Sequence, residues 1–170
     1  EDQERVTAVA ADTGKQLWQT SYKANFVPAY VNDNGPRCVP TVHGNRVVVF
    51  GAQGGLHCLD VKTGKTVWSH DTMALFNSKR SFRGEPPEGY FGKGSSPVVL
   101  DGLVIVNAGG AEKNAGVVAF SLATGKLAWK STDVRASYSS PAVARIGGKI
   151  QVVFAARLNV ISVDPKTGQE

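Results

Sequence analysis

The residues with the most obvious potential for chemistry are two cysteines and three histidines. Cys38 and Cys58 form no Cys-x-x-Cys pattern, and His43, His57 and His70 have no ligand spacing with one another. Protein zinc sites use closely spaced pairs of such ligands. The sequence therefore gives no support to a zinc centre, and a structural role is the default for His57.

Two other short patterns resemble known sites and fail on a required residue. Gly64-Lys65-Thr66 is similar to the end of a phosphate-binding loop, but position 59 is Leu and no helix is expected to follow. The Asn-Asp-Asn string at 32–34 resembles a calcium loop, but no Glu stands at its twelfth position. A turn is favoured at 32–34 instead. The sequence also shows no recognisable Ser-His-Asp set.

Basic and aromatic residues in long polar connections are the remaining candidates for a binding surface. Functional residues are often placed on variable loops that a rigid scaffold presents, and the longest connection, 71–96, has the length typical of a functional loop. One interpretation is that these residues bind an anion at the mouth of a central channel. The other is that they form a polar rim around that mouth and make salt bridges with neighbouring side chains. The candidates are Arg37, Arg80, Arg83, Tyr90, Lys93, Arg135, Tyr138 and Arg157.

A turn that the chain repeats four times indicates which elements would position these residues. Its core is Thr-Gly-Lys, with Gln in place of Lys in the last copy, and a Trp follows the Gly by four residues in three copies. In the first copy Asp12 directly precedes Thr13, two residues closer than Asp60 is to Thr63, which makes the equivalence of Asp12 uncertain. Gly is expected to adopt a positive φ there. The turn glycines are Gly14, Gly64, Gly125 and Gly168, and the tryptophans are Trp18, Trp68 and Trp129.

Upstream of each turn, short β-branched runs are separated by Gly, Asn and Asp turns, and no helical periodicity extends beyond one turn at 72–76. We label the strands of each unit A, near a Pro, through D, which ends with the Trp. Four-stranded units repeating every 40–60 residues or so predict a β-propeller. The fold class is thus all-β, with four-stranded antiparallel blades.

The predicted single domain, 1–170, contains about three blades' worth of strands. It comprises C and D strands at 6–19, blades at 38–69 and 97–130, and a partial blade at 140–170. Propeller rings close with roughly four to eight blades. The sequence therefore predicts an incomplete ring, a fragment of a larger propeller.

The unit Ala-x-Asp-x-x-Thr-Gly-Lys-x-x-Trp resembles the pyrroloquinoline-quinone-like (PQQ-like) propeller repeat. Quinoprotein alcohol dehydrogenases carry this repeat, and so does the propeller lipoprotein of the outer-membrane barrel-assembly machine. The resemblance implies that each Trp docks between neighbouring sheets as a buried structural residue, which agrees with its large apolar area and single N–H donor. It also implies a bacterial periplasmic or extracellular location, with any signal or lipid anchor outside this fragment.

Two functions remain open under this resemblance. The first is a non-catalytic binding or assembly scaffold of the cell envelope, whose protein partner contacts the B–C and D–A connections and which needs no cofactor. The alternative is part of a quinone-dependent dehydrogenase that uses PQQ and Ca²⁺ at the mouth. Such enzymes carry an adjacent Cys-Cys pair, whereas Cys38 and Cys58 are expected on strands A and C, about 9.5 Å apart and too far for a disulfide.

Composition favours partners other than nucleic acid. The net charge is +5, from 19 basic and 14 acidic residues, but the excess is spread along the chain and includes one lysine in or beside each repeated turn. A nucleic-acid footprint requires a concentrated basic patch. The sequence also contains no apolar run of the roughly 18 residues that a transmembrane helix needs.

Overall fold

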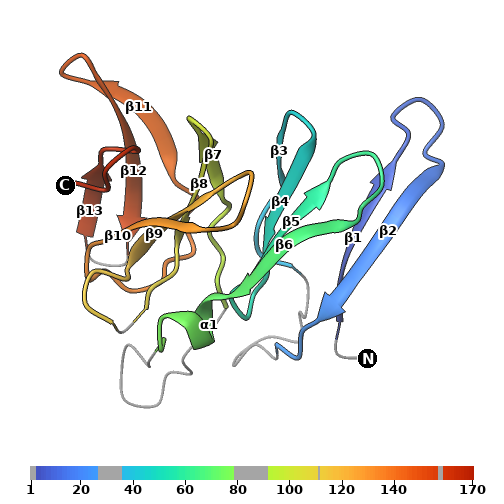
Figure 1. Ribbon diagram of the computed structural model, residues 1–170, viewed down its shortest axis with the longest axis horizontal. Coiled ribbons are helices and arrows are strands. Elements are labelled where there is room, and N and C mark those ends of the chain that lie inside the picture. The colour runs from blue at the N-terminus through green and yellow to red at the C-terminus, as the bar shows by residue number, and fades with distance from the viewer. Residues whose placement is uncertain (1–2, 27–35, 79–91, 111, 157–158) are drawn as a thin grey trace.

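The computed structural model describes all residues except 1–2, 27–35, 79–91, 111 and 157–158. Four antiparallel sheets stand side by side in a fan, in the order in which they occur along the chain (Figure 1). We number them blades 1 to 4 from the N-terminal end. The expectation of an all-β chain built from short antiparallel strands is confirmed.

Blade 1 contains two strands, β1 (Gln3–Val9) and β2 (Gln16–Lys23), which pair as C and D strands. Both extend beyond the predicted range 6–19. The additional residues are mostly polar and carry no apolar signal. They are held in the sheet by cross-strand pairing that includes a hydrogen bond from Tyr22 to Glu4.

Blade 2 is a complete meander of four strands, A to D. They are β3 (Thr41–His43), β4 (Arg46–Phe50), β5 (Gly55–Asp60) and β6 (Thr66–Asp71). One helical turn, α1 (Thr72–Leu75), follows β6 directly. The Asp71 carboxylate accepts a hydrogen bond from the Ala74 amide at 3.0 Å and so caps this turn.

Blade 3 repeats the four-stranded meander, and blade 4 contains three strands. Blade 3 comprises β7 (Val98–Leu100), β8 (Leu103–Asn107), β9 (Val117–Ser121) and β10 (Leu127–Ser131). Blade 4 comprises β11 (Ala142–Ile146), β12 (Lys149–Ala156) and β13 (Asn159–Val163). In both blades, consecutive strands are neighbours in the sheet.

The sheets pack face to face, and their seams contain the core. At the seam of blades 2 and 3, alternate residues of β4 and β5 meet alternate residues of β8 and β9, with Phe50 and Phe120 fully buried. The other face of blade 3 packs on blade 4 through Ile105, Val117 and Phe154. A sheet buried on both faces explains why strands B and C are continuous Val-rich runs.

Two faces of the fan differ in their loops. The A–B and C–D turns are short and lie toward the top of Figure 1, whereas α1 and the described parts of the B–C and D–A connections lie below. We call these the turn face and the connection face. In the part of the chain that the structure describes, no helix has the length and apolar character needed to span a membrane.

Candidate functional site

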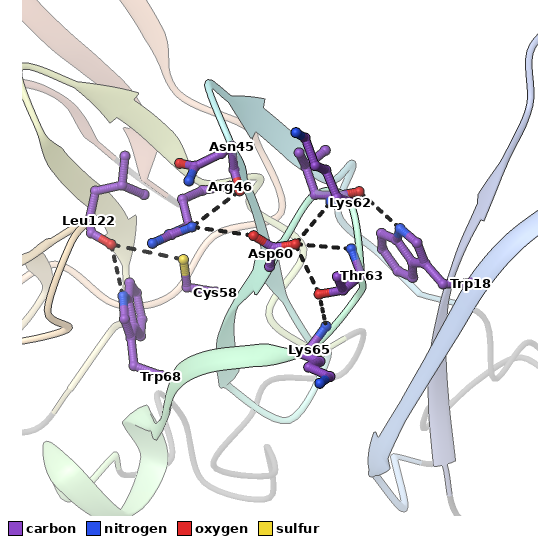
Figure 2. A network of polar contacts seen from close by, with 11 residues as sticks. Trp18, Asn45, Arg46, Cys58, Asp60, Lys62, Thr63, Lys65, Trp68 and Leu122 are labelled. Carbon is purple, nitrogen blue, oxygen red and sulfur yellow. Dashed lines mark hydrogen bonds and ion pairs between the residues drawn. The ribbon is translucent and has the colours of Figure 1, made fainter.

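The C–D turn of blade 2 is organised by one carboxylate (Figure 2). Asp60 Oδ1 accepts hydrogen bonds from the amides of Lys62 and Thr63 and from the Thr63 hydroxyl, at 2.9–3.1 Å. Its Oδ2 lies 3.7 Å from an Arg46 nitrogen. The Thr63 hydroxyl, and then the turn amides, lower the pKa of the Asp60 carboxyl.

The first copy of the turn lacks this carboxylate. Its closing hydrogen bonds run from the Gly14 amide to the Ala10 carbonyl and from the Ala10 amide to the Lys15 carbonyl. The same bonds in blade 2 involve Asp60, so Ala10, and not Asp12, occupies the equivalent position. The uncertainty about Asp12 is thereby resolved, because the chain keeps the shape of the turn and loses the side chain that caps it.

Each D-strand tryptophan reaches across a seam to the C–D turn of the next blade. The indole Nε1 groups of Trp18, Trp68 and Trp129 donate to the carbonyls of Val61, Leu122 and Pro165 at 2.9, 2.9 and 3.1 Å. Figure 2 shows two of these contacts, on either side of blade 2. All three rings are half-buried, where we expected full burial, because D is the edge strand of its sheet.

The ring of each tryptophan rests on the turn glycine. A Cβ on Gly64, Gly125 or Gly168 would lie 2.4–2.8 Å from Trp18, Trp68 or Trp129, whereas a Cβ on Gly14 would meet nothing within 4 Å. The φ angles are similar, at 67–73°. At the three turns that receive a tryptophan, glycine is thus required for two reasons: its positive φ and the close approach of the ring.

A second side chain completes each contact, and the sequence analysis missed it. The residue two positions after each Trp binds the carbonyl of the same turn glycine. These pairs are Thr20 with Gly64, His70 with Gly125, and Ser131 with Gly168. The signal was present as a polar residue at a fixed spacing after every Trp. We call the Trp and this residue together the clasp.

The predicted mouth residues are distributed between buried, half-buried and exposed positions. Lys93 is 1% exposed, and its ammonium group donates to the Ala108 carbonyl at 2.7 Å. Arg37 and Arg135 are half-buried, and Tyr138 is 47% exposed. The other four candidates, Arg80, Arg83, Tyr90 and Arg157, lie outside the described residues.

Hydroxyl groups link the segments that lead into the A strands of blades 2, 3 and 4. The Val39 amide donates to the Ser96 hydroxyl at 2.9 Å, and the Ser96 amide donates to the Ser140 hydroxyl at 3.1 Å. Thr41 adds a bond to the Pro97 carbonyl at 2.7 Å. Several polar groups at the mouth therefore join one blade to the next.

The described residues contain neither a disulfide nor a cluster that could hold a metal ion. Both cysteines are free, as expected. The Cys38 thiol donates to the Phe50 carbonyl, and Cys58 Sγ faces the Leu122 carbonyl at 3.9 Å. Burial raises the pKa of both thiols, that of Cys58 to about 11. Across the described ranges, no three His, Cys, Asp or Glu side chains converge where they could hold a metal ion.

A polar cluster at the seam of blades 1 and 2 was not anticipated. The Glu4 carboxylate accepts bonds from the Tyr22 hydroxyl at 2.7 Å and the Ala52 amide at 3.0 Å. Burial, followed by the Glu4 contact, raises the pKa of Tyr22. The Tyr22 ring stacks on His57 with centroids 3.9 Å apart, and burial lowers the pKa of His57 to about 4. The cluster joins Glu4 and Tyr22 of blade 1 to Ala52 and His57 of blade 2.

Repeated clasps, antiparallel blades and a glycine in every C–D turn together define the repeat. A sequence-family model described as outer membrane protein assembly factor BamB matches residues 2–170. The chain belongs to this family of PQQ-like propellers. Its fold class, a propeller of four-stranded antiparallel blades of which part is present, is confirmed.

Curated relatives are quinone-dependent enzymes. The dehydrogenase subunit of alcohol dehydrogenase (quinone) from Komagataeibacter europaeus is 39% identical over 137 residues, which cover 72% of this chain and 16% of the relative. Quinohemoprotein alcohol dehydrogenase ADH IIB from Pseudomonas putida is 35% identical over 134 residues, covering 74% and 17%. This chain therefore spans only a small part of the length of these relatives.

Solved structures of both kinds share the fold. BamB from Moraxella catarrhalis superposes with a TM-score of 0.62 at 20% identity and covers 97% of this chain, which corresponds to 44% of that protein. A europium-containing methanol dehydrogenase gives the same TM-score at 16% identity, with 97% of this chain and 37% of the enzyme. At these identities the likeness establishes architecture alone.

Proposed function

We propose that the chain is part of a non-catalytic propeller that acts as a binding or assembly scaffold in the bacterial cell envelope, in the periplasm or outside the cell. A protein partner binds its connection face. The observation that carries this proposal is the use of mouth groups as structural links. The Lys93 ammonium group contacts the Ala108 carbonyl, and the hydroxyls of Ser96 and Ser140 bind backbone amides of neighbouring segments.

The two faces support the placement of the partner. On the turn face, every C–D turn has the same closing hydrogen bonds, and three of them receive a clasp. The connection face changes from blade to blade, with α1 after β6 and a longer B–C connection in blade 3. A rigid repeated scaffold that presents variable loops is a common arrangement for recognition.

Site-specific photo-crosslinking in the native envelope tests this placement. A photoreactive residue at Lys113, which is exposed on the connection face, should trap a defined protein partner. The same residue at Lys65, which is exposed on the turn face, is the matched control and should trap none. Equal crosslinking from both positions, or from Lys65 alone, would contradict the proposal.

A quinone-dependent dehydrogenase is the second candidate function, because the curated relatives with 35–39% identity are such enzymes. PQQ and CaCl₂ are added to the full-length protein, and its melting temperature and alcohol-dependent dye reduction are measured. The scaffold proposal expects neither to change. A rise in both would replace it with the enzymatic function.

A further inference from the structure

A groove of about 420 Å³ runs along the outer rim between blades 2 and 3. Its wall on the blade 2 side is formed by the end of β6 and by α1, and its wall on the blade 3 side by the C–D turn and β10. Figure 1 shows α1 directly at the end of β6. The floor is aromatic, with Phe76 and Phe120 almost completely buried.

The rim of the groove exposes large apolar side chains. Leu75 on α1 and Leu127 at the start of β10 are 45% and 46% exposed. Leu127 lies two residues before Trp129, and the corresponding positions before Trp68 and Trp18 are Thr66 and Gln16. The D strand of blade 3 thus carries an apolar residue at a position where the D strands of blades 1 and 2 carry a polar one.

The charge of the rim is also particular to this seam. Lys130, one residue after Trp129, pairs with Glu112 at 3.0 Å, whereas Ser69 and Gln19 occupy the equivalent positions. Lys126 stands at the turn beside the groove and makes no ion pair with any described residue. Two cations therefore face one carboxylate, and the groove has an apolar floor with a net positive edge.

We propose that this groove binds an extended protein segment carrying a large apolar side chain beside acidic residues. The apolar side chain enters between Leu75 and Leu127 and covers their exposed surfaces, while the neighbouring carboxylate pairs with Lys126. Partial burial of an apolar anchor supplies affinity, and the charge sets orientation and association rate. This inference rests on the proposed binding function, names the chemistry of a segment that the scaffold would recognise, and extends the contact from the connection face along the outer rim to the C–D turn of blade 3.

Fluorescence anisotropy with a labelled Gly-Ser-Glu-Phe-Glu-Ser-Gly peptide tests the proposal. The peptide should bind the full-length protein, and replacing its Phe by Ser or its two Glu by Lys should abolish binding. Leu127→Gln, which installs the blade 1 residue, and Lys126→Glu should each weaken binding about ten-fold or more. Lys65→Glu, the same change at the equivalent turn of blade 2, should alter the dissociation constant less than about two-fold.

Amide chemical-shift changes on peptide addition give a second measurement, independent of the variants. They should be confined to α1, the end of β6 and the segment 124–130. No binding, binding that ignores the peptide's Phe, or equal affinity for Leu127→Gln and wild-type protein would overturn the groove proposal. If Lys113 still crosslinks a partner in that case, the scaffold function stands and only its assignment to the groove fails.

Discussion

Among the described residues, blades 2 and 3 meet over eleven buried side chains, almost all apolar, whereas blades 1 and 2 meet over three buried apolar residues and the Glu4–Tyr22 pair. The clasp nevertheless has the same geometry at both seams, because Trp18 and Trp68 each donate to a turn carbonyl at 2.9 Å. The clasp therefore fixes how neighbouring blades are placed. The side chains buried within the seam determine how strongly the two blades are held together and which further contacts the seam can make.

The largest difference is expected from removing the clasp at the apolar seam. Trp68→Ala should lower the free energy of unfolding by about 3–5 kcal/mol, since it deletes the ring that lies on Gly125 and contacts Phe120. Trp18→Ala should cost less because fewer buried side chains surround that ring. Urea denaturation measures both. A loss below about 1 kcal/mol for Trp68→Ala would contradict the role of the clasp.

Alanine at the turn glycines separates backbone strain from the clasp contact. Gly14→Ala and Gly125→Ala meet similar φ values of 67° and 70°, and the strain alone should cost each about 1–2 kcal/mol. At Gly125 the new Cβ would also lie 2.8 Å from the Trp68 ring, which should add about 1–3 kcal/mol. Urea denaturation measures both variants, and equal losses would show that the ring contact is irrelevant.

Acid should weaken the polar seam selectively. The folded-state pKa of His57, about 4, lies below its ordinary value near 6.5, so folding favours the neutral ring. Its contribution is complete above pH 6.5 and is lost as the pH falls toward 4. Because the ring is half-exposed, we expect a loss of about 1–2 kcal/mol.

The control for this pH dependence is His57→Val, which installs the residue found at the corresponding position of blade 3, Val118. Unfolding is followed in urea between pH 7 and pH 4. The variant should lose less stability over this range than the wild-type protein. Identical pH profiles would place the titration elsewhere, for example on the turn carboxylates Asp60 and Asp164, whose pKa values are lowered.

The fold was predictable from the sequence because each blade carries its own local signals. The turn glycines, the β-branched runs and the Trp spacing are short-range features, and each recurs in register. The end of β1 at Val9 and the unexpected role of Ala10 show where this reasoning stops. A turn can keep its hydrogen bonds when its capping side chain is lost, so side-chain identity alone left the alignment of the first copy open.

The contacts that give each seam its character were less predictable, since they join residues from different sheets. Glu4, Tyr22 and His57 are distant in sequence, and no local pattern indicates that they meet. Lys93 appeared to be a mouth residue because of its place before an A strand, but its ammonium group contacts a carbonyl in the interior. Such contacts depend on the packing between blades, which cannot be predicted from the spacing of residues within one blade.

The smallest predicted effect concerns the second member of the clasp. His70→Thr installs the blade 1 residue and keeps a donor for the Gly125 carbonyl, but it removes the stack on Phe120, whose centroid lies 4.7 Å from that of the imidazole. The free energy of unfolding should fall by about 0.5–1.5 kcal/mol. His70→Val, which has no donor, should lose more.

The reciprocal Thr20→His should bring no gain, because Leu59 stands where Phe120 would be needed. A gain from Thr20→His would mean that the imidazole stabilises any seam, and the difference between the two seams would then lie in the clasp itself.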